Sequence, residues 1–205
     1  MKDKKPRGKA VLPLYDALQS IDQDVKPEYR FDWLFLPKSN ERSRLENSIL
    51  QSLQKHCSET SSSYKTAKKN ASASNIYSDD LKIRGISRKL EFDFYLPKYN
   101  IVIEFDELQH FTKERKIALE HLNPDDYSFD VSGWIEHCSA IQINDADPPE
   151  RDWQRAYRDT IRDIRSLQNS VPLLRLFVND FDKDRLKMEH VRQDLIDKIK
   201  ATSSL

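Results

Sequence analysis

Acidic side chains interrupt the most strand-like stretch of the chain, KLEFDFYLPKYNIVIEFDELQHFT. Asp93, Glu104 and Asp106 lie among its aromatic and branched residues, and the stretch closes with Gln109 and His110. Carboxylate oxygens are hard ligands that suit Mg²⁺ or Mn²⁺ better than zinc. A divalent ion held by them could polarise a phosphate and activate water for hydrolysis. The residue types are therefore compatible with metal-dependent hydrolysis of a phosphate ester.

Strand alternation predicts that two of these acids meet. Residues 81–95 and 100–106 are predicted to form two strands joined by a turn at LPKYN, and alternate side chains of a strand share one face. A hairpin, or two neighbouring strands of one sheet, would set Asp93 beside Glu104, with Asp106 on the same face. Carboxylates gathered in a half-buried site cannot all stay ionised without a compensating cation. Alternatively, the acids lie on the solvent-facing side of a half-exposed sheet, and periodicity alone leaves both interpretations open.

The elements around this stretch predict a mixed α/β domain. Helices are expected over residues 11–24, 39–57, 112–121, 132–143, 150–168 and 183–200, and a further strand over 171–178. Ser39 or Asn40 could cap the second helix, and the apolar segment 30–38 could be a strand or a docking segment. This order of elements favours a small mixed central β-sheet flanked by helices.

Length and composition favour one intracellular domain. A chain of 205 residues can bury about 70% of its unfolded surface, so it needs no disulfide or metal to fold. Cys57 and Cys138 make no disulfide framework and fit a reduced compartment, so we expect a cytoplasmic protein. No apolar segment approaches the ~20 residues of a membrane span, and the basic start MKDKKPRGKA is not followed by the apolar region of a signal peptide.

Charge is balanced overall and segregated locally. The chain has 34 basic and 34 acidic residues, so it lacks the uniformly basic composition typical of a nucleic-acid binder. The stretches MKDKKPRGK and YKTAKK are basic, whereas DDYSFD and NDADPPERD are acidic. The balance weakens a prediction of DNA binding without excluding it, because the local distribution of charge matters more than its sum.

The segment FDFYLPKYNIVIEFDELQHF resembles the active-site hairpin of the PD-(D/E)xK, restriction-endonuclease-like nuclease superfamily. It is most similar to the branch related to very-short-patch mismatch repair endonucleases and phage homing-type nucleases. Members of that branch commonly carry Asp-Phe-Tyr-Leu-Pro, a short turn, and Ile-Glu-aromatic-Asp-Gly-Glu-Gln-His-Phe. On this resemblance the first acid is Asp93, the second is Glu104, the following acid is Asp106, and the Gln-His pair is Gln109 and His110.

The resemblance extends over roughly residues 41–181. An upstream helix of the family usually supplies a glutamate, which fits Glu46 in LENSIL, with Glu41 as a competing position. A downstream helix and the apolar strand after it usually carry acids and arginines. The matching residues in RDTIRD and VPLLRLF are Asp159, Arg162, Asp163 and Arg175.

Two departures from the family pattern fall beside the predicted site. The superfamily lysine that follows the second acid is replaced by Asp106, as is common in this branch. A general base or a charge stabiliser is then expected from another residue, His110 or Arg162. The usual Gly-Glu of the turn is replaced by Glu107-Leu108, which alters the loop that presents the Gln-His pair.

The resemblance implies Mg²⁺- or Mn²⁺-dependent hydrolysis of a DNA phosphodiester. Asp93 and Glu104 would hold the metal, with Glu46 or Asp106 contributing directly or through water. The implied catalytic set is Glu46, Asp93, Glu104, Asp106, Gln109, His110, Asp159 and Arg162, and the implied metal ligands are Asp93, Glu104 and Glu46.

Composition and the resemblance together give expectations for domains and partners. Residues 1–40 would form an N-terminal basic arm and extension, and residues 41–205 a nuclease-like domain with a mobile Ser- and Lys-rich loop at 58–76. Double-stranded DNA is a more natural substrate than single-stranded DNA or RNA, in restriction, phage defence or DNA repair. A homodimer or a partner subunit is compatible with the neutral charge. The alternative function is a catalytically degenerate nuclease fold that binds nucleic acid or a partner without cutting.

Other patterns give weaker functional signals. The pairs His56-Cys57 and His137-Cys138 fit no usual zinc spacing, so we expect ordinary buried cysteines. The arginines of the helix at 150–168 could follow a DNA backbone or form a solvated, salt-bridged face with the interleaved aspartates. The tryptophans are expected in the core: Trp33, Trp134 and Trp153.

Overall fold

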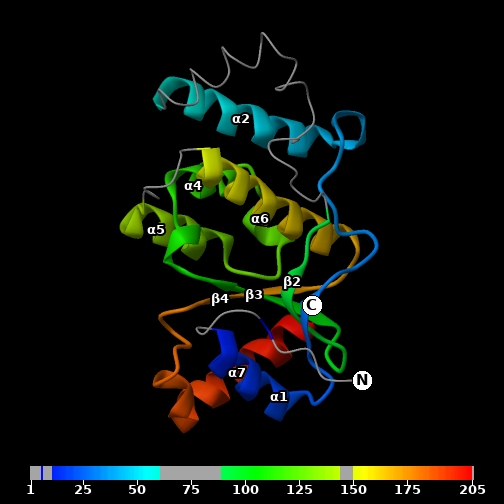
Figure 1. Cartoon of the computed structure of the whole chain (residues 1–205), viewed down its shortest axis with the longest axis vertical. Coiled ribbons are helices and arrows are strands. Elements are labelled where there is room, and N and C mark those ends of the chain that lie inside the picture. Colours follow the sequence, from blue (N-terminus) through cyan, green and yellow to red (C-terminus); the bar gives the residue numbers. More distant parts are fainter. Residues whose placement is uncertain (1–5, 7–10, 61–88, 144–149, 205) are drawn as a thin grey trace.

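A computed structural model describes residues 6, 11–60, 89–143 and 150–204, and within them a four-stranded mixed sheet forms the centre of the molecule (Figure 1). The strands lie in the order β1-β2-β3-β4: β1 Lys26–Tyr29, β2 Phe92–Leu96, β3 Ile101–Asp106 and β4 Leu173–Phe177. The pairs β1–β2 and β2–β3 are antiparallel, and β3–β4 is parallel. The predicted small mixed sheet is therefore confirmed.

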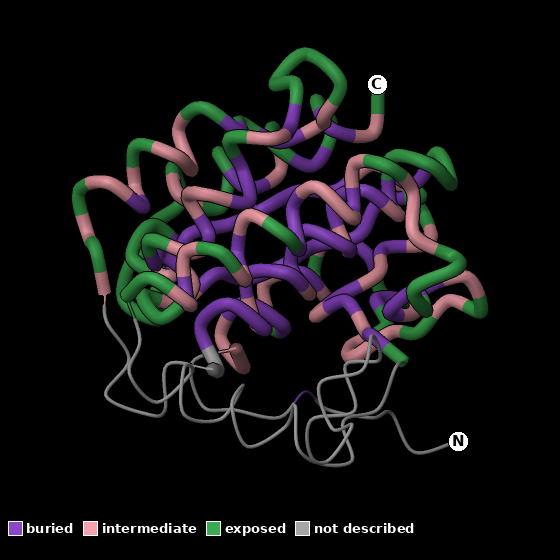
Figure 2. Tube along the Cα trace, turned by 90° about the horizontal axis from the view of Figure 1, so that it is seen from above, coloured by how far each residue is buried: buried purple, intermediate pink, exposed green. Residues whose placement is uncertain are grey.

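Helices cover both faces of this sheet (Figure 1). On one face lie α4 Lys113–Leu119, α5 Val131–Ile141 and α6 Glu150–Gln168, with α2 Arg44–Thr60 packed outside α4 and α6. On the other face lie α1 Val11–Ile21 and α7 Glu189–Ser203. Buried residues accordingly run through the middle of the molecule (Figure 2). The short 3₁₀ helices are η1 Ser39–Glu41, η2 Leu108–His110, η3 Pro124–Asp126 and η4 Arg185–Lys187.

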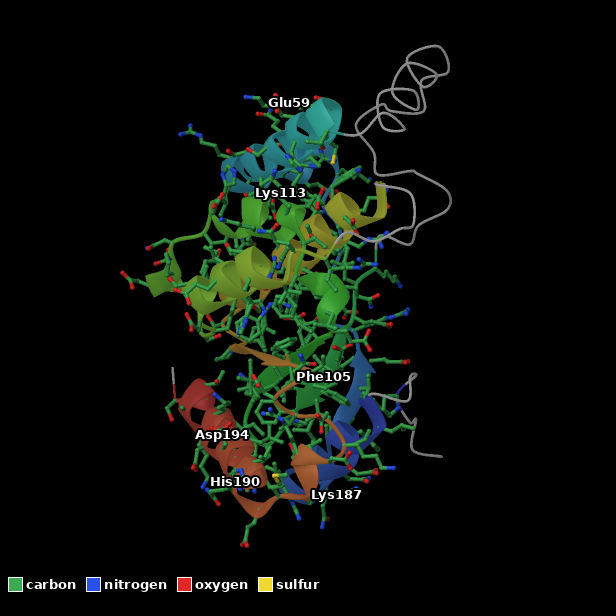
Figure 3. All side chains as sticks on the ribbon, turned by 90° about the vertical axis from the view of Figure 1, so that its left-hand side faces the viewer. Glu59, Phe105, Lys113, Lys187, His190 and Asp194 are labelled. Carbon is green, nitrogen blue, oxygen red and sulfur yellow. The ribbon has the colours of Figure 1, made fainter. Side chains whose placement is uncertain are left out.

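The alternation of β3 sorts its side chains between two hydrophobic clusters, one on each face of the sheet. Ile101, Ile103 and Phe105 belong to the cluster shared with α1 and α7. Figure 3 shows His190 and Asp194 of α7 on this side of the sheet, with Lys187 just before that helix. Val102 belongs to the cluster on the side of α4, α5 and α6. Because every residue of β3 is buried, the acids of this strand face packed helices. The alternative of a solvent-facing acidic strand is therefore wrong.

The hairpin turn forms as its residue types predict. The amide of Asn100 donates to the carbonyl of Pro97 at 3.3 Å, and Asn100 has a left-handed φ of 51°. Asparagine tolerates this conformation better than most residues. The turn therefore fixes the register in which β3 returns along β2.

Two local predictions in the N-terminal part of the chain need correction. The helix α2 begins after Ser43, not after Ser39 or Asn40, because residues 39–41 form the separate turn η1. The segment 30–38 contains only an isolated bridge from Phe35, and the strand of this region is β1, just before it. The strand β1 is an edge strand, where its Pro27 removes no hydrogen bond needed inside the sheet.

Residues 11–40 were assigned from sequence to an extension. In the structure they contribute β1 to the sheet and α1 to the helical layer that contains α7. Of the loop predicted at 58–76, the first three residues belong to α2 and the remainder lies outside the described residues.

Trp153 is buried, and Trp33 and Trp134 pack against the core. Both cysteines are buried thiols. Over the described ranges, no helix has the length and apolar character needed to cross a membrane.

Candidate active site

The backbone pairing of β2 and β3 stops where the two predicted acids face each other. The ladder pairs Phe94 with Ile103, so the next opposed residues are Asp93 and Glu104. At this point carboxylates replace carbonyls as acceptors. The amide of Asp93 donates to Oε1 of Glu104 at 3.3 Å, and the amide of Phe105 donates to Oδ2 of Asp93 at 2.8 Å. The acids therefore meet as strand alternation predicts, and they also join the two strands.

Helix α6 places Arg162 against this pair of acids. Its Nε lies 3.5 Å from Oε1 of Glu104 and donates to the carbonyl of Glu91 at 2.9 Å. Its Nη1 donates to Oδ1 of Asp159 at 2.9 Å. The guanidinium is thus held by three oxygens while the side chain stays 16% exposed, so its charge lies at the border between the acids and solvent.

The imidazole of His110, in η2, lies on the other side of Asp159. Its Nδ1 is 2.9 Å from Oδ2 of Asp159 and 3.5 Å from Oδ1 of Asp106. Burial lowers the pKa of His110, but the charge and hydrogen bond of Asp159 outweigh this effect, so the pKa is raised above its usual value. Among the described residues, the ring nitrogen Nε2 has no hydrogen-bond partner. His110 can therefore present a proton at Nε2 while Asp159 holds Nδ1.

The carboxylate of Asp106 belongs to a buried charge network and is fully engaged by it. Nη1 of Arg175 donates to both oxygens of Asp106 at 2.8 Å, and Nε1 of Trp134 donates to Oδ2 at 2.7 Å. Arg175 also binds Asp163, whose second oxygen accepts from Arg115 at 2.7 Å. Burial would raise the pKa of Asp106, but Arg175 and its hydrogen bonds lower it. This network fixes β3, β4, α4 and α6 relative to one another.

Charge is unevenly compensated between the network and the pair of acids. Burial raises the pKa of Glu104 to about 8, although Arg162 opposes this shift and Asp93 adds to it. Burial likewise raises the pKa of Asp93, although the Phe105 amide and Arg162 lower it. Within the described residues, Arg162 is the cation that forms an ion pair with Glu104, and it is shared with Asp159. Full ionisation of Asp93 and Glu104 would therefore leave negative charge that the protein only partly compensates, and Glu104 keeps its proton to about pH 8.

Two carboxylates suit a Mg²⁺ ion that keeps part of its water shell, because they are too few to enclose a metal ion with protein ligands alone. Mg²⁺ usually keeps several waters and binds through one or two carboxylates, and its charge would compensate Asp93 and Glu104. Among the residues that the structure describes, no group of three or more His, Cys, Asp or Glu side chains is arranged to hold a metal ion. The donor set thus suits a site with two protein carboxylates.

Two of the predicted site residues lie apart from this pair. Glu46 forms a capping box at the start of α2: its Oε2 accepts from the amide of Ser43 at 2.7 Å, and its own amide donates to Oγ of Ser43 at 3.2 Å. Its Oε1 lies 2.9 Å from Nη2 of Arg165. Gln109 is exposed and donates through Nε2 to Oε2 of Glu107 at 2.8 Å. Within the described part of the chain, no hydrogen bond or ion pair joins either residue to the two acids.

Sequence reasoning missed part of the charge network. Arg115 is fully buried, and Trp134 was expected only as a core residue. The amphipathic pattern of KERKIAL gives no sign that one of its cations points inward. The spacing of Ser43 and Glu46 is that of a capping box, and this pattern in the sequence could have predicted the structural role of Glu46.

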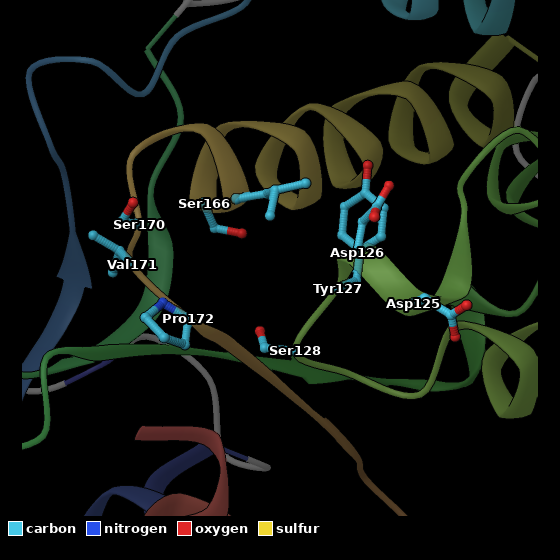
Figure 4. A pocket seen from close by; sticks show the side chains of 9 residues that line it. Asp125, Asp126, Tyr127, Ser128, Ser166, Ser170, Val171 and Pro172 are labelled. Carbon is cyan, nitrogen blue, oxygen red and sulfur yellow. The ribbon is translucent and has the colours of Figure 1, made fainter. Parts of the chain in front are cut away.

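A separate cavity of about 350 Å³ lies where η3 meets the end of α6 and the start of β4 (Figure 4). Asp125, Asp126 and Ser166 are among its lining residues, and none of the predicted site residues lines it. Ser128, also in its wall, accepts from the amide of Leu173 at 2.8 Å and donates to the carbonyl of the same residue at 2.9 Å. The cavity is therefore distinct from the site at Asp93.

Comparisons with known proteins add no assignment to this geometry. No protein-family model matches the chain, and neither a curated protein nor a solved structure matches it. A function must therefore be inferred from the side chains themselves.

Proposed function

We propose that this chain is a metal-dependent endonuclease that hydrolyses DNA phosphodiester bonds. The observation that carries the proposal is the opposed pair Asp93 and Glu104 at the end of the β2–β3 ladder, with incompletely compensated charge and with Arg162 alongside. The antiparallel hairpin followed by a parallel strand is compatible with a restriction-endonuclease-like core. Restriction, phage defence and DNA repair are the settings that the motif resemblance suggests, and buried thiols suit the cytoplasm.

In this proposal Asp93 and Glu104 would hold Mg²⁺ or Mn²⁺. When bound, such an ion supplies Lewis-acid polarisation of the phosphate and a more acidic water. Arg162, whose guanidinium lies 3.5 Å from Glu104 and is partly exposed, would offset negative charge that develops on the phosphate.

Asp159 raises the pKa of His110 above its usual value, which favours the protonated imidazole. Its Nε2 would donate a proton to the leaving oxygen while Asp159 stabilises the imidazolium. The role of base, expected from sequence, would require a pH above the raised pKa of His110.

A plasmid-nicking assay tests the proposal. The parent should nick supercoiled DNA with Mg²⁺ or Mn²⁺, and both Asp93→Ala and Asp93→Asn should abolish nicking with the fold retained. Asp93→Asn keeps an oxygen that can accept from the Phe105 amide, so it separates loss of charge from loss of the strand contact. Glu136→Gln, an exposed change on α5, is the matched control and should cut like the parent. Nicking by the purified Asp93 variants at the parental rate would refute the assignment.

A binding protein without catalytic activity is the second candidate. It is favoured by the engagement of Asp106 with Arg175 and Trp134, which leaves two acids in place of a larger donor set. It is also favoured by the altered turn, in which Leu108 is 40% exposed. DNA or protein binding by a parent that cuts under none of the metal conditions would support this candidate.

A further inference from the structure

One face of α6 carries a row of partly exposed arginines: Arg155, Arg158, Arg162 and Arg165. Their spacing of three and four residues places them on the same side of the helix. A row of this kind can be a salt-bridged face or a track for phosphates, and the partners of each guanidinium distinguish these cases.

Three arginines of the row are held by the protein. Arg155 donates to the carbonyl of Gln109 at 3.0 Å and to Asp152 at 3.2 Å. Arg162 binds Asp159 and the Glu91 carbonyl, as described above. Arg165 lies 2.9 Å from Glu46 and donates to Gln168 at 2.8 Å. These contacts are those of a salt-bridged face.

Arg158 differs from its neighbours in the row. Among the described residues, its side chain makes no hydrogen bond and no ion pair. Arg155 and Arg162 lie about one helical turn away on either side, and burial together with their like charge lowers the pKa of Arg158, partly offset by Asp159. A half-buried guanidinium in a field of like charge favours an anion as its partner.

The position of Arg158 places such an anion next to the candidate active site. Arg155 is fixed to the turn after β3 through Gln109, and Arg162 is fixed to Glu104. Arg158 lies between them, about 6 Å along the helix axis from Arg162. An anion bound there would lie at the rim of the site and beside the reacting phosphate.

We propose that Arg158 is a positioning residue that binds a non-scissile phosphate of the DNA backbone. The inference rests on the proposed function, since it takes DNA as the ligand. A guanidinium suits this role because its fork of N–H groups matches two phosphate oxygens. Arg158 would hold the strand while the neighbouring acids act on the adjacent phosphate.

The test is equilibrium binding of a fluorescein-labelled DNA duplex, with Ca²⁺ in place of Mg²⁺, over a series of salt concentrations. Arg158→Gln should weaken binding about tenfold at low salt and reduce the slope of log K against log salt by about 0.9. Arg158→Lys should restore most of the slope, because it keeps the charge. Lys187→Ala, in the helical layer on the opposite side of the sheet (Figure 3), is the control and should keep the parental slope. Both Arg158 variants should have the Tm of the parent, because Arg158 makes no stabilising ion pair with the described residues.

The outcomes separate this inference from the proposed function. A parental slope and affinity in Arg158→Gln would overturn the role of Arg158, even if the parent cuts DNA. Arg158-dependent binding by a parent that never cuts would support the role and refute the endonuclease. A parent that binds no DNA, or that binds an RNA duplex more tightly, would overturn the inference itself.

Discussion

Replacing Glu104 by Gln tests the charge imbalance of the site with little change in side-chain shape. The side-chain oxygen of the glutamine can still accept the hydrogen bond that the backbone N–H of Asp93 donates to Glu104 at 3.3 Å. An unfolded chain releases the Glu104 proton near pH 4.5, whereas the folded chain holds it to about pH 8. The folded state therefore binds more protons between these values, and the free energy of unfolding falls as pH rises through them. Asp93, whose pKa is also raised, contributes with the same sign.

The size of the effect follows from the same shift. One pKa unit corresponds to about 1.4 kcal/mol, so ionisable Glu104 destabilises the fold by about 3 kcal/mol at pH 7. Glu104→Gln should be more stable than the parent by about this amount at pH 7, or roughly 6–12 °C in Tm. The difference should shrink to near zero as pH approaches 4.5, where both states hold the proton.

Urea unfolding from pH 5 to pH 8 in EDTA, followed by tryptophan fluorescence, measures this difference. Addition of Mg²⁺ at pH 8 should raise the stability of the parent and leave Glu104→Gln unchanged. Glu136→Gln, exposed on α5, controls for the loss of one negative charge. A difference between the parent and Glu104→Gln that stays constant with pH would refute the assignment of a raised pKa to this carboxyl.

Three further predictions address the surroundings of the site. Arg175→Met leaves Asp106 buried without its guanidinium and should cost about 3–5 kcal/mol in urea unfolding; a cost below 1 kcal/mol would contradict the role of the network. The His110 imidazole should titrate above 6.5 in an NMR pH series. Its contribution to stability is then present at low pH and is lost as pH rises through the raised pKa. A midpoint at or below 6.5 would count against the pairing of His110 with Asp159. Ser43→Ala should destabilise the fold by about 1 kcal/mol through loss of the capping box, whereas Ser39→Ala, its matched control, should not; equal effects would contradict the corrected start of α2.

Features set by local periodicity could be predicted from the sequence. The facing of Asp93 and Glu104 follows from strand alternation and a turn with Asn100 at its left-handed position. The bounds of α6 were predicted from its composition and the proline-rich stop before it. The strand β1 was missed because Tyr29 is the one residue of the four that favours strands, and Pro27 argues against a strand.

Features set by contacts between distant segments could not be predicted. The capture of Asp106 by Arg175 depends on the parallel register of β3 and β4, which pairs Glu104 with Arg175. No pattern within either segment specifies that register. The inward direction of Arg115 likewise depends on Asp163, which lies on another helix.

The end of the β2–β3 ladder has a consequence for measurement. The amide protons of Asp93 and Phe105 are held by carboxylate oxygens, not by carbonyls of a neighbouring strand. Their protection from hydrogen exchange therefore depends on the ionisation and occupancy of the same acids that would bind a ligand. These two amides give a local, residue-specific record of the state of the site, and they do so whether or not the protein turns over a substrate.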